Sequence, residues 1–325
     1  MLSCIIVGDG LIVNSDAGSL LLATFTNGDG RPIMMLSRSE FITVRGMRHH
    51  VRHWGAATAP LLVMLHGWMD VSASFQFVVD ELQKEWHVIA PDWRGFGLTD
   101  PTPADTYWFA DYLGDLDAIL THFSPIQPVN LLGHSMGANV AMLYAGVRPH
   151  RIAKLINLEG FGMPASQPQQ APHRYASWLD QLASRPTLRG YASQDEVIAR
   201  LQKNNPRLPR ERATFLSSHW AAQQSDGQWQ LLADGAHKLT SPLLYHVDDV
   251  TACWQRITAP VLWVEAADTD VWRWLGPKET ARIEIDRRIA FIANVDTVMI
   301  EEAGHMVHHD QPAILAQHIE RFLIS

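Results

Sequence analysis

The 325-residue sequence predicts an α/β fold in which a mainly parallel sheet is flanked by helices. Short and continuously apolar runs, such as Leu61–Leu65 and Val261–Val264, are typical of strands that are buried on both faces. Amphipathic segments of helical period, such as Tyr112–Phe123, lie between such runs. Strands and helices that alternate at short spacing favour βαβ units, and these units build parallel sheets.

The first predicted element is a β-hairpin over residues Phe41–Trp54. Ile42, Val44 and Val51 alternate with polar residues, and Gly46 supplies the turn. The elements that follow alternate regularly: strand Leu61–Leu65, helix Phe75–Lys84, strand His87–Ala90, helix Tyr112–Phe123, strand Val129–Leu132, helix Ala138–Val147 and strand Leu155–Leu158.

This alternation stops after Glu159. Residues 160–259 contain prolines, glutamines and helical patches, but no buried-strand pattern. We therefore predict a helical cap over 160–259, inserted after the sixth strand into a core formed by residues 34–159 and 260–325. The core resumes with these elements: strand Val261–Val264, helix Pro277–Arg288, strand Asp296–Ile300 and helix Ala313–Leu323.

Residues 1–33 are expected to form a poorly ordered N-terminal extension, because Gly, Asp and Asn are scattered through them without a period. The apolar stretch Leu20–Ala23 is preceded by Asp9 and Asp16 and by no basic region. A secretory signal begins with a basic region, so none is predicted here.

Charge and composition argue against several classes of partner. The formal net charge is −8, whereas nucleic acids and anionic membranes attract basic surfaces. No apolar run approaches 18 residues, and the two cysteines, Cys4 and Cys253, make neither a disulfide framework nor a zinc spacing. We therefore expect a cytoplasmic monomer or homodimer with free thiols and no nucleic-acid or membrane partner.

The strongest chemical signal is Gly133–Gly137, which reads Gly-His-Ser-Met-Gly and lies between a predicted strand and a predicted helix. A chain that reverses sharply from strand to helix holds its central serine in a strained conformation, with the hydroxyl projecting above the sheet edge. The glycines on either side keep the neighbouring backbone from clashing. Ser135 is therefore the predicted nucleophile.

Four segments together resemble the α/β-hydrolase superfamily: His66–Trp68 after a buried strand, Pro91–Gly97, the serine turn Gly133–Gly137, and Gly304-His305 near the C-terminus. Their order and spacing match that family from about Phe41 to Ser325, except in the middle insertion. The resemblance implies the α/β-hydrolase fold, a helical cap over the active site, and a Ser–acid–His triad in that chain order.

The resemblance also implies an oxyanion hole formed by the backbone N–H groups of Trp68 and Met136, because a tetrahedral oxyanion needs donors fixed in advance. His66 is interpreted as structural, as are Asp92 and Arg94, which we expect to tie loops together. The histidines of the first hairpin, His49, His50 and His53, are expected to be solvated or structural: none belongs to a family motif.

His305 is the predicted general base, since it follows the last strand where the family places this residue; His308 and His309 are nearby alternatives. The acid that orients the imidazole is left open among three carboxylates. Asp268 follows the strand Val261–Val264, the usual place in the family, and Asp270 lies two residues further on. Glu159 ends the preceding strand, where some haloalkane dehalogenases and cofactor-free dioxygenases carry their acid.

A serine nucleophile favours acyl transfer and argues against the dehalogenase and epoxide hydrolase reactions, which need a carboxylate nucleophile. The predicted function is hydrolysis of a carboxylic ester or related carbonyl compound through an acyl-enzyme on Ser135. A cofactor-free dioxygenase or lyase and a non-catalytic ligand-sensing protein are the alternatives.

The substrate is expected to be small and hydrophobic or aromatic, because the cap is rich in tryptophan. The sequence contains no phosphate-binding loop, metal-ligand cluster or cluster of Lys and Arg, so no cofactor, metal or polyanionic substrate is predicted. The side chains expected to contact the substrate are Trp68, His134, Phe161 and Met163.

Overall fold

The computed structural model describes residues 4–7, 10–13 and 34–325 of the chain. The chain divides into two compact units, Met1–Leu36 and Ser37–Ser325. In the first unit, β1 (Cys4–Val7) and β2 (Gly10–Val13) pair as an antiparallel ribbon. The remainder of the extension predicted over residues 1–33 lies outside the described residues.

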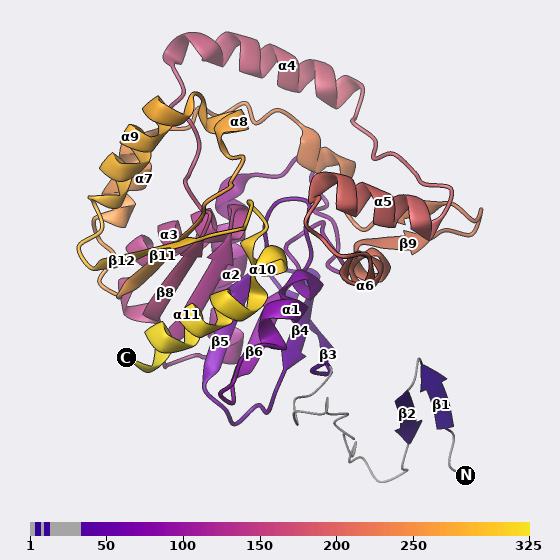
Figure 1. Cartoon of the computed structure of the whole chain (residues 1–325). Coiled ribbons are helices and arrows are strands. Elements are labelled where there is room, and N and C mark those ends of the chain that lie inside the picture. The colour runs from indigo at the N-terminus through magenta and orange to yellow at the C-terminus, as the bar shows by residue number, and fades with distance from the viewer. Residues whose placement is uncertain (1–3, 8–9, 14–33) are drawn as a thin grey trace. The chain divides into compact units, whose positions relative to one another are not determined.

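An eight-stranded sheet forms the centre of the second unit, in the order β12-β11-β8-β7-β5-β6-β4-β3 (Figure 1). Neighbouring strands are parallel from β12 to β6, whereas β4 pairs antiparallel with β6 and with β3. The mainly parallel sheet predicted from the sequence is thus confirmed. The strands are β3 (Arg38–Val44), β4 (Met47–Trp54), β5 (Leu61–Leu65), β6 (His87–Pro91), β7 (Val129–His134), β8 (Ile152–Leu158), β11 (Val261–Ala266) and β12 (Val295–Ile300).

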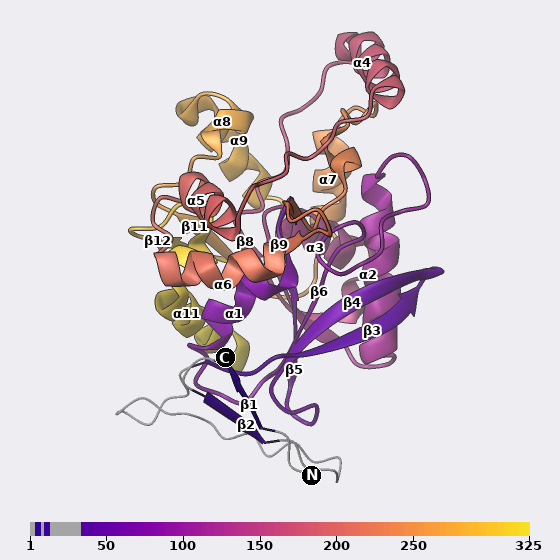
Figure 2. The ribbon, with the colours of Figure 1, turned by 90° about the vertical axis from the view of Figure 1, so that its right-hand side faces the viewer.

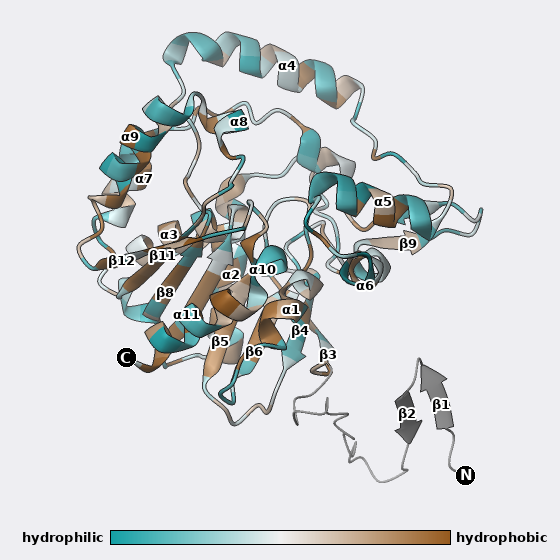
Figure 3. Ribbon diagram, viewed as in Figure 1, coloured by the Kyte–Doolittle hydropathy of each residue, from teal (hydrophilic) through white to brown (hydrophobic). Residues whose placement is uncertain are grey.

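Helices cover both faces of the sheet, with α1 and α11 on one side and α2 on the other (Figure 2). The contacts agree with this division, because α1, α10 and α11 touch one another while α3 touches α2 and α7. Helices therefore bury the apolar central strands from both sides, as the brown strands in Figure 3 illustrate. The helices are α1 (Gln76–Val79), α2 (Phe109–Phe123), α3 (Met136–Val147), α7 (Val247–Trp254), α8 (Trp272–Leu275), α9 (Lys278–Ile289), α10 (Val307–Asp310) and α11 (Pro312–Ile324).

The helix predicted over Phe75–Lys84 is only partly correct. A 3-10 turn, Ser72–Phe75, precedes a single α-helical turn that ends at Val79. The backbone N–H groups of Gln83 and Lys84 instead donate to the Glu320 carboxylate on α11, at 3.0 and 2.6 Å. A long-range acceptor that the local sequence pattern cannot show thus replaces the helix hydrogen bonds.

The segment between β8 and β11 is mainly helical, in the region where a cap is predicted. Helices α5 (Gln194–Asn204) and α6 (Arg210–Trp220) pack with Phe77 in a separate hydrophobic cluster. Helix α4 (Ala171–Ala183) buries none of its residues and stands apart from the other helices in Figure 1. The segment also contains a small antiparallel pair that the sequence did not predict, because strands of three residues give no periodic signal: β9 (Ala221–Gln223) and β10 (Trp229–Leu231).

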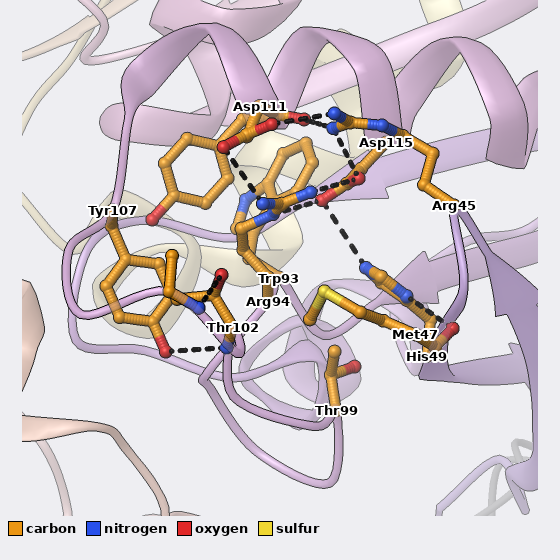
Figure 4. Close-up of polar contacts among 12 residues, drawn as sticks. Arg45, Met47, His49, Trp93, Arg94, Thr99, Thr102, Tyr107, Asp111 and Asp115 are labelled. Carbon is orange, nitrogen blue, oxygen red and sulfur yellow. Dashed lines mark hydrogen bonds and ion pairs between the residues drawn. The ribbon is translucent and has the colours of Figure 1, made fainter.

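The turn after β6 is held by buried ion pairs, which Figure 4 shows. Arg94 donates two hydrogen bonds of 2.6 Å to the Asp115 carboxylate, and Arg45 and His49 approach the same group at 3.2 and 3.5 Å. Asp92 fastens the turn to its neighbours by accepting from the Ser72 N–H at 2.7 Å. The sequence-based interpretation of Asp92 and Arg94 as loop ties is therefore confirmed.

The hairpin histidines are structural rather than solvated. His49 and His50 are fully buried, and His53 is 1% exposed. His50 makes a 2.7 Å hydrogen bond to Asp92, and His53 lies 3.1 Å from a ring nitrogen of His87.

Candidate active site

Ser135 lies at a sharp turn between the end of β7 and the start of α3. Its backbone has φ 52° and ψ −115°, a conformation that L-residues rarely adopt. A Cβ on Gly133 would come within 2.5 Å of the backbone of Ala138, and one on Gly137 within 2.2 Å of the Leu65 carbonyl oxygen. Both glycines are thus required for α3 to approach the sheet closely enough to form this turn.

His305 reaches Ser135 from the loop that follows β12. Its Nε2 atom lies 3.0 Å from the Ser135 hydroxyl oxygen. The backbone carbonyl of His305 is 2.8 Å from Nε2 of His134, which therefore fixes the loop from the strand that precedes the serine. The structure thus brings together the nucleophile and base that the sequence predicts, at hydrogen-bonding distance.

The carboxylate that contacts His305 is Glu159, one of the three alternatives. Its Oε2 atom lies 3.2 Å from Nδ1 of His305, and its side chain is fully buried. Glu159 follows β8 directly and has φ 57°. It accepts a 2.7 Å hydrogen bond from the Ala266 N–H and another from the Thr269 hydroxyl, so β11 and the loop after it hold the carboxylate in place.

The first choice from the sequence, Asp268, does not reach the histidine. Its side chain is 53% exposed and pairs with Arg207 at 2.6 Å. Asp270 is 45% exposed and pairs with Arg273 at 2.9 Å. Both of these carboxylates pair with arginines at partly exposed positions, whereas the Glu159 side chain is fully buried beside His305. The structure therefore corrects Asp268 to Glu159 as the carboxylate on His305.

Burial governs the protonation of this pair. Desolvation raises the pKa of the Glu159 carboxyl to about 8, although hydrogen bonds from Thr269 and Ala266 oppose the shift. Desolvation lowers the pKa of the His305 imidazole to about 4, although the carboxylates of Asp270 and Asp70 oppose it. Both pKa shifts favour the uncharged forms, a protonated Glu159 and a neutral His305, over a carboxylate and an imidazolium in the site without substrate.

The two alternative histidines have other positions. His308 and His309 are buried on α10, and the His308 ring is tilted by 56° against the His134 ring, with centroids 4.4 Å apart. Neither forms a hydrogen bond to Ser135 within the described part of the chain. His305 alone of the three thus has the position of a base.

The predicted oxyanion loop lies directly beside the nucleophile. A Cβ on Gly67 would lie 3.3 Å from Cβ of Ser135, so the loop that contains Trp68 packs against the serine turn. His66 fixes this loop, as expected of a structural residue, because Nδ1 is 2.8 Å from the Gly67 carbonyl and Nε2 accepts the Trp93 N–H at 3.0 Å. Met136 is the first residue of α3, where backbone N–H groups have no partner inside the helix.

A pocket of about 1080 Å³ opens above Ser135. Trp68 and His134 line it, as the sequence predicts, together with Trp220 from the cap segment. The other two residues predicted to contact the substrate, Phe161 and Met163, do not line this pocket. Phe161 is 2% exposed and packs edge-on against Trp263 in the core, and Met163 is 46% exposed, away from the pocket lining.

Two residues beside His305 and Glu159 were not predicted from the sequence. Trp274 also lines the pocket, and its ring meets that of His305 edge-on with centroids 5.2 Å apart. Thr269 donates to Glu159. No motif surrounds either residue, so only their place in the fold identifies them.

One group of buried side chains in the described part of the chain has the donor atoms of a metal site. Asp70, His308 and His309 bring one oxygen and two nitrogens within 4.8 Å of one another. This group was not predicted, because Asp70 is far from the two histidines along the chain.

Comparison with known proteins identifies the family. Residues 60–312, more than half of the chain, match the family described as the alpha/beta hydrolase fold. The chain belongs to this family.

Two curated relatives of this α/β hydrolase match most of their own length. A serine hydrolase-like protein of Danio rerio is 24% identical over 278 residues, which cover 83% of each chain. The AB hydrolase superfamily protein YfhM of Bacillus subtilis is 24% identical over 310 residues, which cover 88% of this chain and 98% of the relative.

The fold also matches solved structures. The thioesterase domain from the curacin biosynthetic pathway superposes with a TM-score of 0.77 and 23% identity, over 88% of this chain and 99% of that domain. At this identity the likeness shows the α/β-hydrolase fold alone. None of the helices in the described ranges combines the length and the apolar character needed to cross a membrane.

Proposed function

We propose that this α/β hydrolase is a serine hydrolase that cleaves a carboxylic ester or a related carbonyl compound through an acyl-enzyme on Ser135. The observation that carries the proposal is the hydrogen-bonded series from Ser135 through His305 to Glu159, with links of 3.0 and 3.2 Å. A nucleophile, a base and an orienting acid in contact form the arrangement that acyl transfer requires.

In the first half-reaction, the Ser135 oxygen attacks the substrate carbonyl carbon while His305 Nε2 accepts the hydroxyl proton. The negative charge that develops on the carbonyl oxygen is held by the N–H groups of Trp68 and Met136. His305 then donates its proton to the leaving group. In the second half-reaction a water molecule, deprotonated by His305, attacks the acyl carbon; His305 returns the proton to the departing Ser135 oxygen, which releases the acid and regenerates the site.

Glu159 has the role of holding the imidazole with its proton on Nδ1, so that Nε2 faces the serine with a free lone pair. It also stabilises the imidazolium that forms in each half-reaction. The donors from Ala266 and Thr269 support this role, because they fix the carboxylate before the substrate binds.

We also propose a small-molecule substrate with apolar or aromatic groups near the serine, since the indole side chains of Trp68, Trp220 and Trp274 line the pocket. A chain with two cysteines, of which Cys253 is a free thiol, is compatible with action in the cytoplasm.

The decisive experiment is labelling with a fluorophosphonate, followed by mapping of the modified peptide. We expect the label on Ser135, and we expect hydrolysis of p-nitrophenyl butyrate that is lost in Ser135→Ala. A label on any other serine would overturn the proposed nucleophile. Negligible turnover combined with ligand-dependent capture of a partner protein would instead favour the ligand-sensing alternative.

A second candidate function follows from the pair His305–Glu159. A histidine held by a buried acid can deprotonate a substrate directly, as a cofactor-free dioxygenase or lyase requires. Oxygen uptake with a hydroxyquinolone that partly survives Ser135→Ala would favour this candidate, because its chemistry needs no serine nucleophile.

A further inference from the structure

The pocket above Ser135 has an excess of basic side chains. Five basic residues line it: Arg189, Arg200, Lys203, Lys238 and Arg273. Three acidic residues line it: Asp70, Glu196 and Asp270. This excess is local, because the chain as a whole carries a formal net charge of −8.

Three of these cations are not neutralised by a neighbouring carboxylate. Two of the five are paired, since Arg189 lies 3.8 Å from Glu196 and Arg273 lies 2.9 Å from Asp270. Within residues 34–325, the other three form no ion pair in the structure: Arg200, Lys203 and Lys238.

Helix α5 presents two of the unpaired cations to the pocket on one face. Arg200 and Lys203 share this face with Glu196 and Ala199, at spacings of three and four residues. The opposite face of α5 is apolar and packs against α6. Because the apolar face of α5 is buried against α6, Arg200 and Lys203 on the opposite face are directed toward the pocket.

Helix stability alone does not explain this arrangement. A cation in the last turn of α5 interacts favourably with the helix dipole, which accounts for Lys203. Arg200 lies before the last turn, and Lys238 comes from the separate 3-10 segment Gly235–Lys238. Two segments far apart in the sequence thus contribute unpaired cations to one cavity.

The size of the cavity leaves room for a group beyond the scissile bond. Its volume of about 1080 Å³ is slightly above the range of about 300–1,000 Å³ for pockets that enclose small ligands. The three tryptophans accommodate apolar parts of a ligand, and the unpaired cations accommodate a negative charge.

We propose that the natural substrate is an ester or thioester that carries a carboxylate or phosphate, bound by Arg200, Lys203 and Lys238. The inference rests on the serine hydrolase function proposed above and adds the charge of the substrate. The sequence analysis did not predict an anionic substrate, because these cations form no cluster along the chain.

The test compares two p-nitrophenyl esters with four-carbon acyl groups. One is the neutral butyrate, and the other is the mono-ester of succinic acid, which ends in a carboxylate. We expect the wild-type protein to have a higher kcat/KM for the succinyl ester, and we expect this preference to shrink as salt screens the charges. A matched pair of thioesters, butyryl-CoA and S-butyryl-N-acetylcysteamine, tests a phosphate-bearing substrate in the same way.

The double variant Arg200→Glu with Lys203→Glu reverses the charge of the α5 face. It is expected to raise KM for the favoured anionic substrate about tenfold or more while KM for its neutral counterpart stays within about twofold. The matched control is Lys278→Glu with Arg321→Glu, which changes the net charge equally at exposed positions outside the pocket lining. This control is expected to leave both KM values unchanged.

The outcomes separate this proposal from the one on which it rests. Hydrolysis that depends on Ser135 but shows no preference for either anionic substrate would overturn the anionic class and leave the serine hydrolase standing. An equal effect of the double variant on charged and neutral substrates would also overturn it. If no ester or thioester is hydrolysed in a Ser135-dependent manner, both proposals fail.

Discussion

Glu159 contacts the His305 ring from a fully buried position, and its replacement tests the role of the acid. Glu159→Gln keeps the size of the side chain but removes its charge, so it no longer holds the Nδ1 proton as an ionised acceptor. We expect kcat to fall by about 10³-fold or more in an ester hydrolysis assay.

Asp268→Asn is the matched control for that variant, because Asp268 follows the strand where such an acid is usual but pairs with Arg207 at the surface. It should change kcat by less than about twofold. A larger loss in Asp268→Asn than in Glu159→Gln would show that the acid is the one first chosen from the sequence.

The pH dependence of activity reports on the same pair. The active state needs the Glu159 carboxylate and a neutral His305, and burial raises the pKa of Glu159 to about 8. As pH falls through this range the pair gains a proton, and His305 loses its productive tautomer. We therefore expect kcat/KM to rise with pH, with a midpoint near 8 that belongs to the pair.

The residual activity of Glu159→Gln provides the comparison for this profile. Without the carboxyl group only His305 titrates, and burial lowers the pKa of its imidazole to about 4. The rising limb should therefore move to lower pH in the variant. Superimposable limbs in the two proteins would assign the wild-type limb to another group.

The role of a single residue can be predicted from the sequence when neighbouring residues in the chain fix its position, and not when distant segments do. Ser135 and His305 were identified because each lies in a short motif beside a predicted strand. The acid was not resolved, because the choice among Glu159, Asp268 and Asp270 depends on which way two loops turn. That direction is set by contacts more than 100 residues apart, such as the hydrogen bond from Ala266 to Glu159.

At the scale of elements, the close approach of α3 to β5 makes Gly137 a position where two effects oppose each other. Helix propensity favours alanine over glycine by about 0.5–1 kcal/mol. A Cβ at this position, however, would lie 2.2 Å from the Leu65 carbonyl oxygen and 2.6 Å from that of His66. Because backbone atoms cannot move aside easily, we expect Gly137→Ala to destabilise the protein by about 2–3 kcal/mol in urea unfolding.

Gly190→Ala is the control for this substitution. The nearest atom to a Cβ at Gly190 is 3.8 Å away, which is an ordinary contact. Its free energy of unfolding should stay within about 0.5 kcal/mol of the wild type. If Gly137→Ala is equally neutral and still reacts with a fluorophosphonate, the tight packing of the serine turn is not required.

Elements were predicted well where a segment repeats its pattern and poorly where it does not. The alternating strands and helices from β5 to β8 follow the hydrophobic period. The helix expected to reach Lys84 ends early, because the backbone N–H groups of Gln83 and Lys84 donate to the Glu320 carboxylate instead. Phe161 was expected to contact the substrate as one of the apolar residues of the insertion, but it packs into the core against Trp263.

For the whole molecule, buried neutral histidines couple stability to pH. Desolvation lowers the pKa of His53 to about 3 and of His237 to about 4, and it also lowers the pKa of the fully buried His66. Unfolding returns each ring to water, where its pKa is about 6.5. The unfolded chain therefore binds more protons than the folded chain at pH values between these limits.

Because the unfolded chain binds more protons, acidification favours unfolding. The stability contributed by these rings is complete above about pH 6.5 and is lost as the pH falls from there toward the folded-state values. At roughly one kcal/mol per ring and pH unit, after allowance for partial exposure, His53 and His237 together cost about 2 kcal/mol at pH 5.5, and His66 adds to this loss. That is a large fraction of the 5–15 kcal/mol that stabilises a typical domain.

We therefore expect the free energy of unfolding in urea to fall between pH 7 and pH 5, because these rings outnumber Glu159, whose pKa, raised by burial, has the opposite effect in this range. His237, whose ring stacks between Phe96 and Tyr107 at centroid distances of 3.7 and 3.6 Å, allows a direct check. His237→Gln removes one titrating ring, so its stability should depend less steeply on pH than that of the wild type even if it is lower at pH 7. Parallel curves for the two proteins would mean that folding does not change the pKa of the His237 ring.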